Sequence, residues 1–254
     1  MASIEVSTDV PRGEPLKTAE AVSIFSPKSV ESWLSVLRSE STTMEEFRRN
    51  ADYISLVLGS YLAESLTTVP QQITTPVGET QTQVVDGRGV LLVGVLRSAE
   101  PMCRGIRLAM PGAQIAYIDA KRDEETAIAS EFYNGLPDSV ANYGRIIIPD
   151  PMLATGGTAR MTIEMLRERG ATNIECVAIV AAPEGIMKIQ QAYPTIPITT
   201  CALDKELNPR KYIVPGLGDF GDRYFGNSGL VIIDELNNKQ LIYENGRFVK
   251  AEDR

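Results

Sequence analysis

The sequence predicts an α/β fold in which a parallel-sheet core carries helices on both faces. Apolar runs of strand length, such as residues 90–96 and 177–182, alternate with segments of helical periodicity. Strands that alternate with helices in this way form parallel sheets through right-handed crossovers. Ligands of such folds bind at the carboxyl ends of the strands, so the functional residues are expected there.

Composition excludes several classes of protein. The 254 residues are 43% apolar and 23% charged, which is typical of a globular chain with one good core. A net charge of -8 disfavours nucleic acid as a partner. The absence of histidine excludes imidazole bases and the usual catalytic zinc sites.

Cysteine usage and apolar runs predict the compartment. Cys103, Cys176 and Cys201 are widely spaced and form no CxxC pair, so neither a disulfide framework nor a thiolate metal site is indicated. The longest apolar runs fall far short of the ~18 residues of a membrane helix, and the first 15 residues lack the apolar stretch of a leader. We therefore expect a cytoplasmic protein without a membrane partner.

The N-terminal region predicts a tail and two helices. Residues 1–25 are polar and aperiodic, which is typical of a mobile tail. Apolar residues at helical spacing over 30–37 follow Pro27, which the first turn of a helix tolerates. Thr43 and Glu46 form a capping box before a longer apolar stripe over 44–62.

The remaining segments predict a core at 26–227 and a terminal extension. Residues 69–85 mix Thr, Val, Ile and Gln with Pro and Gly, which indicates a hairpin or a small hood. The charged stretch 120–142 is expected to be a surface arm or a lid. Residues 228–254 contain three β-prone runs separated by Asn-Asn and Asn-Gly, typical of a β-meander. Strands are expected at 90–96, 114–118, 145–148, 174–182 and 196–203, and helices at 100–110, 158–169 and 183–193.

The most informative segment is RIIIPDPMLATGGT, residues 145–158, where a buried strand ends at an acid and a Gly-Gly turn opens a helix. Gly156 and Gly157 permit positive φ angles and carry no Cβ. Consecutive backbone N–H groups can therefore converge on one anion at the positive end of the helix. Thr155 and Thr158 add hydroxyl donors. The pattern predicts a phosphate monoester at the turn, with Asp150 placed to accept hydrogen bonds from sugar hydroxyls.

This segment resembles the phosphoribosyl-pyrophosphate (PRPP) signature of the type I phosphoribosyltransferases, and DPMLATGG is similar to that of the uracil phosphoribosyltransferases. Most type I relatives carry two consecutive acids, where this chain has Asp-Pro at 150–151. The resemblance continues in Leu96-Arg97, in RDEET at 122–126, in VAAPEG at 180–185 and in YIVPGLGDFGDRYFGN at 212–227. It covers about residues 28–227.

The resemblance implies the type I phosphoribosyltransferase fold, with a small hood and a flexible β arm. The implied reaction transfers 5-phosphoribosyl from PRPP to N1 of uracil, giving UMP and pyrophosphate in pyrimidine salvage. The implied cofactor is Mg²⁺, carried mainly by PRPP and water rather than by a protein metal site. A homodimer or homotetramer is also implied, as is activation by GTP, which some members show; the sequence places no GTP site.

The family pattern also assigns roles to residues. Asp150, Arg97 and Asp219 are the expected catalytic residues, because displacement of pyrophosphate through a cation-like sugar needs charge neutralisation and positioning rather than a strong base. Arg97 and Arg122 are expected on pyrophosphate, whose paired oxygens suit guanidinium forks. The remaining PRPP ligands are expected to be Asp150, Pro151, Met152, Leu153, Ala154, Thr155, Gly156, Gly157, Thr158 and Asp219.

The loop at 213–220 is expected to bind the base. Uracil offers a donor at N3 and acceptors at O2 and O4, so backbone groups can read it and reject cytosine. The Phe220 ring is expected to cover the base. The expected uracil ligands are Ile213, Gly218, Asp219 and Phe220.

One loop departs from the family pattern. Relatives usually show Ala-Gly-Leu-Gly-Met after Leu96-Arg97, with a non-proline cis peptide after the arginine, whereas this chain has Ser-Ala-Glu-Pro-Met at 98–102. Glu100 either points inward, towards pyrophosphate, or outward as an acid favoured at a helix N-terminus. The alternative function is therefore a homologue without turnover that binds uracil or a nucleotide as a regulator. An RNA-binding regulator is disfavoured by the net charge.

Overall fold

The computed structural model describes residues 22–122, 129–226, 230–234, 239–244 and 247–250, and the side chains within 22–119 and 133–226. Its centre is a seven-stranded sheet that is parallel except at one edge, where the last strand is antiparallel to its neighbour. The strands in spatial order are β1 (Val22–Ile24), β9 (Ile198–Leu203), β8 (Ile174–Ala181), β7 (Arg145–Leu153), β4 (Val90–Leu96), β5 (Gln114–Arg122) and β6 (Ala129–Asn134). The predicted α/β class and the order of its core elements are confirmed.

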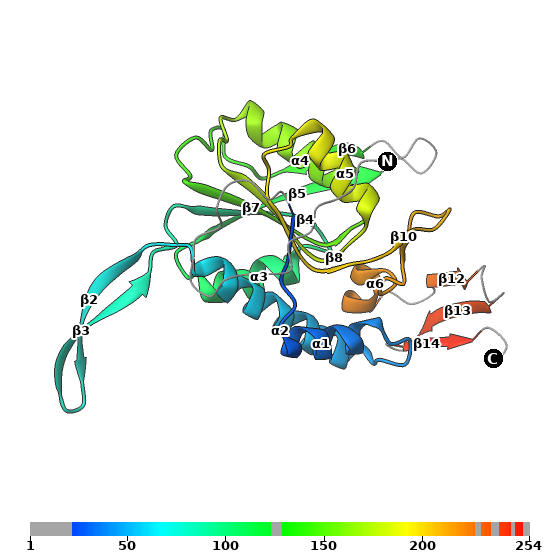
Figure 1. Ribbon diagram of the computed structural model, residues 1–254, viewed down its shortest axis with the longest axis horizontal. Coiled ribbons are helices and arrows are strands. Elements are labelled where there is room, and N and C mark those ends of the chain that lie inside the picture. The colour runs from blue at the N-terminus through cyan, green and yellow to red at the C-terminus, as the bar shows by residue number, and fades with distance from the viewer. Residues whose placement is uncertain (1–21, 123–128, 227–229, 235–238, 245–246, 251–254) are drawn as a thin grey trace.

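Helices cover both faces of this sheet (Figure 1). On β4, Leu92 packs into the cluster that holds one set of helices, whereas Leu91 and Val93 pack into the other cluster. This alternation follows from the two-residue period of a strand that is buried on both sides. The first set is α1 (Lys28–Arg38), α2 (Met44–Ala63) and α3 (Glu100–Ala109), and the second is α4 (Gly157–Glu168) and α5 (Pro183–Ala192).

The predicted helix signals act as expected. The Thr43 hydroxyl accepts a hydrogen bond from the Glu46 amide at 3.3 Å, and the Glu46 carboxylate accepts one from the Thr43 amide at 3.1 Å. This capping box begins α2, and Pro27 is the N-cap residue of α1. The predicted stop signal of α4 also acts as expected. Gly170 follows the C-terminal end of this helix, has φ of 90° and closes it.

Apart from a short hairpin at 206–214 that is described below, three antiparallel units lie outside or at the edge of the parallel sheet. The hairpin of β2 (Thr68–Thr75) and β3 (Gly78–Val85) projects from the body, and most of its residues are exposed (Figure 1). The segment 69–85 is therefore a hairpin, as one of the two predicted alternatives had it, and not a hood. β5 and β6 pair as an arm at the sheet edge. The predicted meander is confirmed as β12 (Leu230–Asp234), β13 (Lys239–Glu244) and β14 (Arg247–Lys250).

Two predicted boundaries are wrong. Val22–Ile24, placed in the tail by the sequence, forms the edge strand β1, where the Ser23 and Thr199 hydroxyls lie 3.0 Å apart; three residues are too few to show a period. β7 does not end at 148 but continues to Leu153, pairing with β8. Its prolines are tolerated because the ladder between β7 and β4 ends at Ile147. Residues 1–21 lie outside the described residues.

The length and hydropathy of the helices bear on the prediction that the protein has no membrane partner. No helix in the described part of the chain is long and apolar enough to cross a membrane.

Candidate active site

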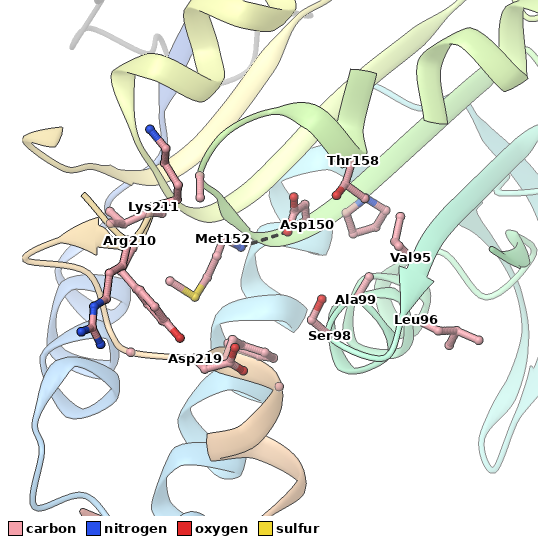
Figure 2. Close-up of a pocket in the computed structure, with 17 residues that line it drawn as sticks. Val95, Leu96, Ser98, Ala99, Asp150, Met152, Thr158, Arg210, Lys211 and Asp219 are labelled. Atoms are coloured by element: carbon pink, nitrogen blue, oxygen red, sulfur yellow. Dashed lines mark hydrogen bonds between the residues drawn. The ribbon is translucent and has the colours of Figure 1, made fainter. Parts of the chain in front are cut away.

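A cavity of about 520 Å³ lies at the carboxyl ends of β4 and β7 (Figure 2). This volume is that of a small-molecule site, and the location is where ligands of parallel sheets bind. The cavity lies where the sequence predicts the functional residues. It is lined by Val95, Leu96, Ser98, Ala99, Pro149, Asp150, Met152, Ala154, Thr158, Arg210, Lys211, Tyr212, Ile213, Gly218, Asp219, Phe220 and Gly221.

Three short elements complete the cavity opposite the sheet. β10 (Glu206–Leu207) and β11 (Ile213–Val214) form a small antiparallel hairpin, and α6 (Phe220–Phe225) follows it. Between β11 and α6, Gly216 and Gly218 have φ angles of 62° and 81°, which turn the chain back towards the cavity. This segment, rather than the exposed hairpin of β2 and β3, covers the site.

Asp150 lies on the sheet side of the cavity. Its Oδ1 accepts a hydrogen bond of 3.1 Å from the Met152 amide, drawn as a dashed line in Figure 2. Asp150, Met152 and Ala154 line the cavity, as does Pro149 on the preceding position of β7. Pro151 and Leu153, both buried, point to the other side, and the structure does not bring these two expected PRPP ligands to the cavity.

The Thr-Gly-Gly-Thr turn forms an open helix end beside the cavity. Gly156 is the N-cap of α4, has φ of 70° and offers no side chain to cap the helix. The Gly157 amide donates a long hydrogen bond of 3.4 Å to Thr155 Oγ1, and the other backbone N–H groups of the first turn are placed to bind an anion. Thr158 lines the cavity, while Thr155, Gly156 and Gly157 form the turn next to it. The geometry supports the predicted phosphate subsite.

Gly156 is required by close backbone packing. A Cβ on Gly156 would lie 2.6 Å from the Gly185 carbonyl oxygen, and a Cβ on Gly185 would lie 2.4 Å from the Ala154 oxygen. The turn and the VAAPEG segment at 180–185 therefore touch backbone to backbone. This contact explains why both segments need glycine, and it brings the first turns of α5 beside the phosphate turn.

Lys188 is a functional candidate that the sequence analysis missed. A Cβ on Gly157 would lie 3.7 Å from Lys188 Nζ and 3.6 Å from Thr155 Oγ1, so the ammonium lies against the turn. The side chain is exposed and has no ion-pair partner among the described residues. A single lysine in a helix gives no sequence signal; only the contact between Gly156 and Gly185 reveals it.

Asp219 lies across the cavity from Asp150 (Figure 2). It is the N-cap of α6, and its Oδ1 accepts a hydrogen bond of 2.8 Å from the Asp222 amide. Burial raises the pKa of the Asp219 carboxyl above its ordinary value, although the Arg97 guanidinium favours the ionised form. Two carboxylates thus lie on opposite sides of one cavity.

Arg97 and Glu100 lie beside the cavity rather than in its lining. The Arg97 Cζ lies 5.4 Å from the centre of the Phe225 ring, and its neighbours Leu96 and Ser98 line the cavity. The cis peptide is Leu96–Arg97, one bond before the predicted position, so that expectation is wrong. Glu100 is absent from the lining, which favours the outward reading. The Arg122 side chain lies outside the described residues.

The expected uracil ligands Ile213, Gly218, Asp219 and Phe220 all line the cavity. The Phe220 ring does not cover it, however. Its centroid lies 5.3 Å from that of Phe47 and 5.7 Å from that of Tyr224, and the residue is 2% exposed. The ring is part of the core, so that expectation is wrong and backbone groups are left to contact a base.

The loop between β10 and β11 adds residues that the sequence analysis did not single out. Arg210, Lys211 and Tyr212 line the cavity, and Figure 2 shows Arg210 and Lys211 on the side opposite Ser98 and Ala99. Lys211 has φ of 67°, which is uncommon for a residue other than glycine. Strands of two residues carry no readable period, so sequence patterns could not place this loop.

The family model for uracil phosphoribosyltransferase matches residues 24–227. The chain belongs to this family. A uracil phosphoribosyltransferase of Streptococcus uberis is 40% identical over 203 residues, covering 80% of this chain and 97% of the relative. One from Streptococcus salivarius is 39% identical over the same shares. A solved structure of a protein from Aquifex aeolicus has a TM-score of 0.72 at 26% identity and covers 80% of this chain and 97% of that one. The family match therefore includes every element that lines the cavity, and it ends before the meander.

Proposed function

We propose that this uracil phosphoribosyltransferase family member is an active pentosyltransferase that converts uracil and PRPP to UMP and pyrophosphate. One observation carries the proposal: Asp150 lies between a phosphate turn and a base-binding loop that meet in a single cavity. The three parts correspond to the 5-phosphate, ribose and base of the product. The family membership supports the same reaction.

The turn at 155–158 would hold the 5-phosphate of PRPP. The amides at the start of α4, the Thr158 hydroxyl and the Lys188 ammonium would supply the donors and the positive charge. Amides at a helix N-terminus and a nearby cation both favour a phosphate dianion. Binding energy at this remote phosphate would position the ribose for reaction.

Asp150 would contact the ribose hydroxyls and stabilise the cation-like sugar. A fixed carboxylate next to developing positive charge lowers the barrier without transferring a proton. The Met152 amide holds one oxygen of this carboxylate in place. The other side of the reacting carbon would face the base loop, so that N1 of uracil forms the bond to C1 as the C1–oxygen bond to pyrophosphate breaks, and the N1 proton passes to the departing pyrophosphate.

Pyrophosphate would lie at the end of β4, where Ser98 and Ala99 line the cavity. Arg97 is exposed and its guanidinium rests on the Phe225 ring, from which a long side chain can turn to the leaving group. Glu100 lies outside the lining, so its carboxylate would not contact the leaving group. Arg122 would add a second guanidinium from the arm, as the family pattern implies.

The donor set of the cavity fits Mg²⁺ that enters with pyrophosphate. Mg²⁺ uses one or two carboxylates together with substrate oxygens and water, and Asp150 and Asp219 are the two carboxylates of the lining. Either carboxylate would supply at most a single ligand to an ion that substrate oxygens and water carry, in keeping with the expectation that the protein has no metal site of its own. When bound, it would neutralise charge on the pyrophosphate leaving group.

The test is UMP formation by purified protein given uracil, PRPP and Mg²⁺, with hypoxanthine, orotate and cytosine in parallel reactions. We expect turnover with uracil alone, and loss of turnover on chelation of Mg²⁺. UMP binding without turnover would overturn the proposal in favour of the alternative, a nucleotide-binding regulator, and would make residues 98–102 the segment to revert to the family sequence.

The assembly, its regulation and its location stay predictions. A homodimer or homotetramer is expected from the family, as is activation by GTP in some members, and a cytoplasmic location is expected from the cysteine pattern. Size-exclusion chromatography with light scattering tests the first, and rates with and without GTP test the second.

A further inference from the structure

The base-binding loop faces a particular physical problem. Backbone groups read the base in the proposed function, on which this inference rests, so selectivity depends on the conformation of the loop and not on its side chains. Gly216 and Gly218 give this loop its conformational freedom. A free loop would lose affinity to the entropy of ordering. Something outside the loop must therefore hold it.

One ion pair holds the Gly216 peptide from both sides. The Arg38 guanidinium, at the end of α1, donates to both oxygens of Asp204 at 2.6 and 2.8 Å. The Gly216 amide donates to Asp204 Oδ2 at 2.9 Å, and Arg38 Nη1 donates to the Gly216 carbonyl at 2.7 Å. The N–H group of Gly216 is thus bound by Asp204, and its carbonyl group is bound by Arg38.

The carboxylate of this pair is fixed by the sheet. Asp204 directly follows β9, and its amide donates to the Ala181 carbonyl at 2.8 Å at the end of β8. The side chains of Asp204 and Arg38 are 5% and 25% exposed. Bidentate pairs in this partly buried setting are directional as well as strong. The position of the Gly216 peptide is therefore fixed relative to the sheet that carries Asp150.

A second arginine fixes the next residue of the loop. Arg223, on α6 and 2% exposed, donates to the Leu217 carbonyl at 2.7 Å. The same guanidinium donates to the Leu37 carbonyl and, at 2.7 Å, to the Ser39 carbonyl. Its Cζ lies 4.4 Å from the centre of the Phe47 ring. Leu217 is thereby tied to the same end of α1 that carries Arg38.

We propose that Arg38, Asp204 and Arg223 form a base clamp, a set of positioning residues that sets the affinity of this chain for uracil. None of them lines the cavity. They act through the peptides of Gly216 and Leu217, which precede the base-reading residues Gly218 and Asp219. The C-terminal end of α1, far in sequence from every PRPP motif, thus determines the affinity for the base.

The test substitutes Arg38→Lys, which keeps the charge but cannot form the two-pronged pair and reach the Gly216 carbonyl as well. We expect the KM for uracil to rise at least about tenfold, because misplacement by about 1 Å costs up to about a hundredfold in a positioned site. The KM for PRPP should stay within about twofold of the wild-type value. Equal changes in both constants would overturn the proposal.

A matched control separates positioning from stability. Arg145 and Glu175 form another buried bidentate pair, with side chains 13% and 7% exposed, and Arg145 also donates to the Leu62 carbonyl at 2.7 Å. This pair lies at the amino end of β7, away from the cavity. Arg145→Lys should lower the melting midpoint as Arg38→Lys does while leaving the KM for uracil unchanged. A rise in that KM in the control would contradict the clamp.

Calorimetry gives a readout that does not need turnover. UMP and ribose 5-phosphate differ only in the base, so the ratio of their affinities isolates the base subsite. Arg38→Lys and Asp204→Asn should reduce this ratio at least about tenfold relative to wild type and leave ribose 5-phosphate binding unchanged. An unchanged ratio would overturn the clamp, whereas a wild-type protein that does not prefer UMP would overturn the proposed function itself.

Discussion

Gly156→Ala tests the backbone contact on which the phosphate turn depends. An alanine at φ of 70° lies in the left-handed region, which costs about 1–2 kcal/mol for a residue with a Cβ. That Cβ would also lie 2.6 Å from the Gly185 oxygen, and relief of such overpacking costs about 1–3 kcal/mol. The less flexible unfolded chain offsets about 0.4–1 kcal/mol.

The net loss expected for Gly156→Ala is about 1–5 kcal/mol of unfolding free energy, with a middle value of about 3 kcal/mol. For a chain of this size, this corresponds to a fall of roughly 10 °C in the thermal midpoint, measured by calorimetry at fixed protein concentration. The neighbouring variant Gly157→Ala is the control, since its Cβ would approach no atom closer than 3.6 Å. It should change the midpoint little but weaken ribose 5-phosphate binding, because the methyl lies between the turn and Lys188. Equal midpoints for the two variants would refute the reasoning.

Three further predictions address the carboxylate, the helix cap and the thiols. Burial raises the pKa of Asp219, so its ionised form opposes folding above that pKa and this cost disappears as the pH falls through it. Asp219→Asn, which keeps the acceptor for the Asp222 amide, should therefore not lower the melting midpoint at pH 7, while turnover falls about a hundredfold or more. A destabilised variant would contradict this sign. Thr43→Ala should lower the unfolding free energy by about 1 kcal/mol through loss of the capping box, with unchanged kcat; an unchanged denaturation curve would count against the cap. Burial raises the pKa of Cys103 and Cys201 to about 12, so a thiol reagent at pH 8 should label neither in the native protein and both in denaturant, and rapid native labelling would be the opposite result.

The sequence was sufficient for the elements that carry a long period or a local signal. Residues 90–96 and 174–182 are recognisable as buried strands because apolar residues run almost unbroken through them, with Glu175 the one charged residue. The capping box of Thr43 and Glu46 is a local pattern of four residues. The phosphate turn was also predictable, because a buried strand, an acid, Thr-Gly-Gly-Thr and a helix follow one another in that order, which is far more specific than Gly-Gly alone. These features depend on neighbours in the chain.

Features that depend on long-range packing were not predictable. Arg38 and Asp204 are 166 residues apart, so no spacing connects them. Lys188 gains a role only because Gly185 touches Gly156. Pro151 was assigned as a ligand from its place in a motif, although strand alternation points it away from the cavity. Family motifs locate a site, but the direction of each side chain is set by the strand that carries it.

The most direct test of the central claim is the turnover of Asp150→Asn beside the wild-type protein. The amide oxygen can still accept the hydrogen bond from the Met152 amide, so the melting midpoint should stay within about 2 °C. The account predicts that kcat for UMP formation falls at least about a hundredfold, because the charge that stabilises the cation-like sugar is lost. Near-normal turnover by the folded variant would contradict the assignment of this cavity as the site of phosphoribosyl transfer.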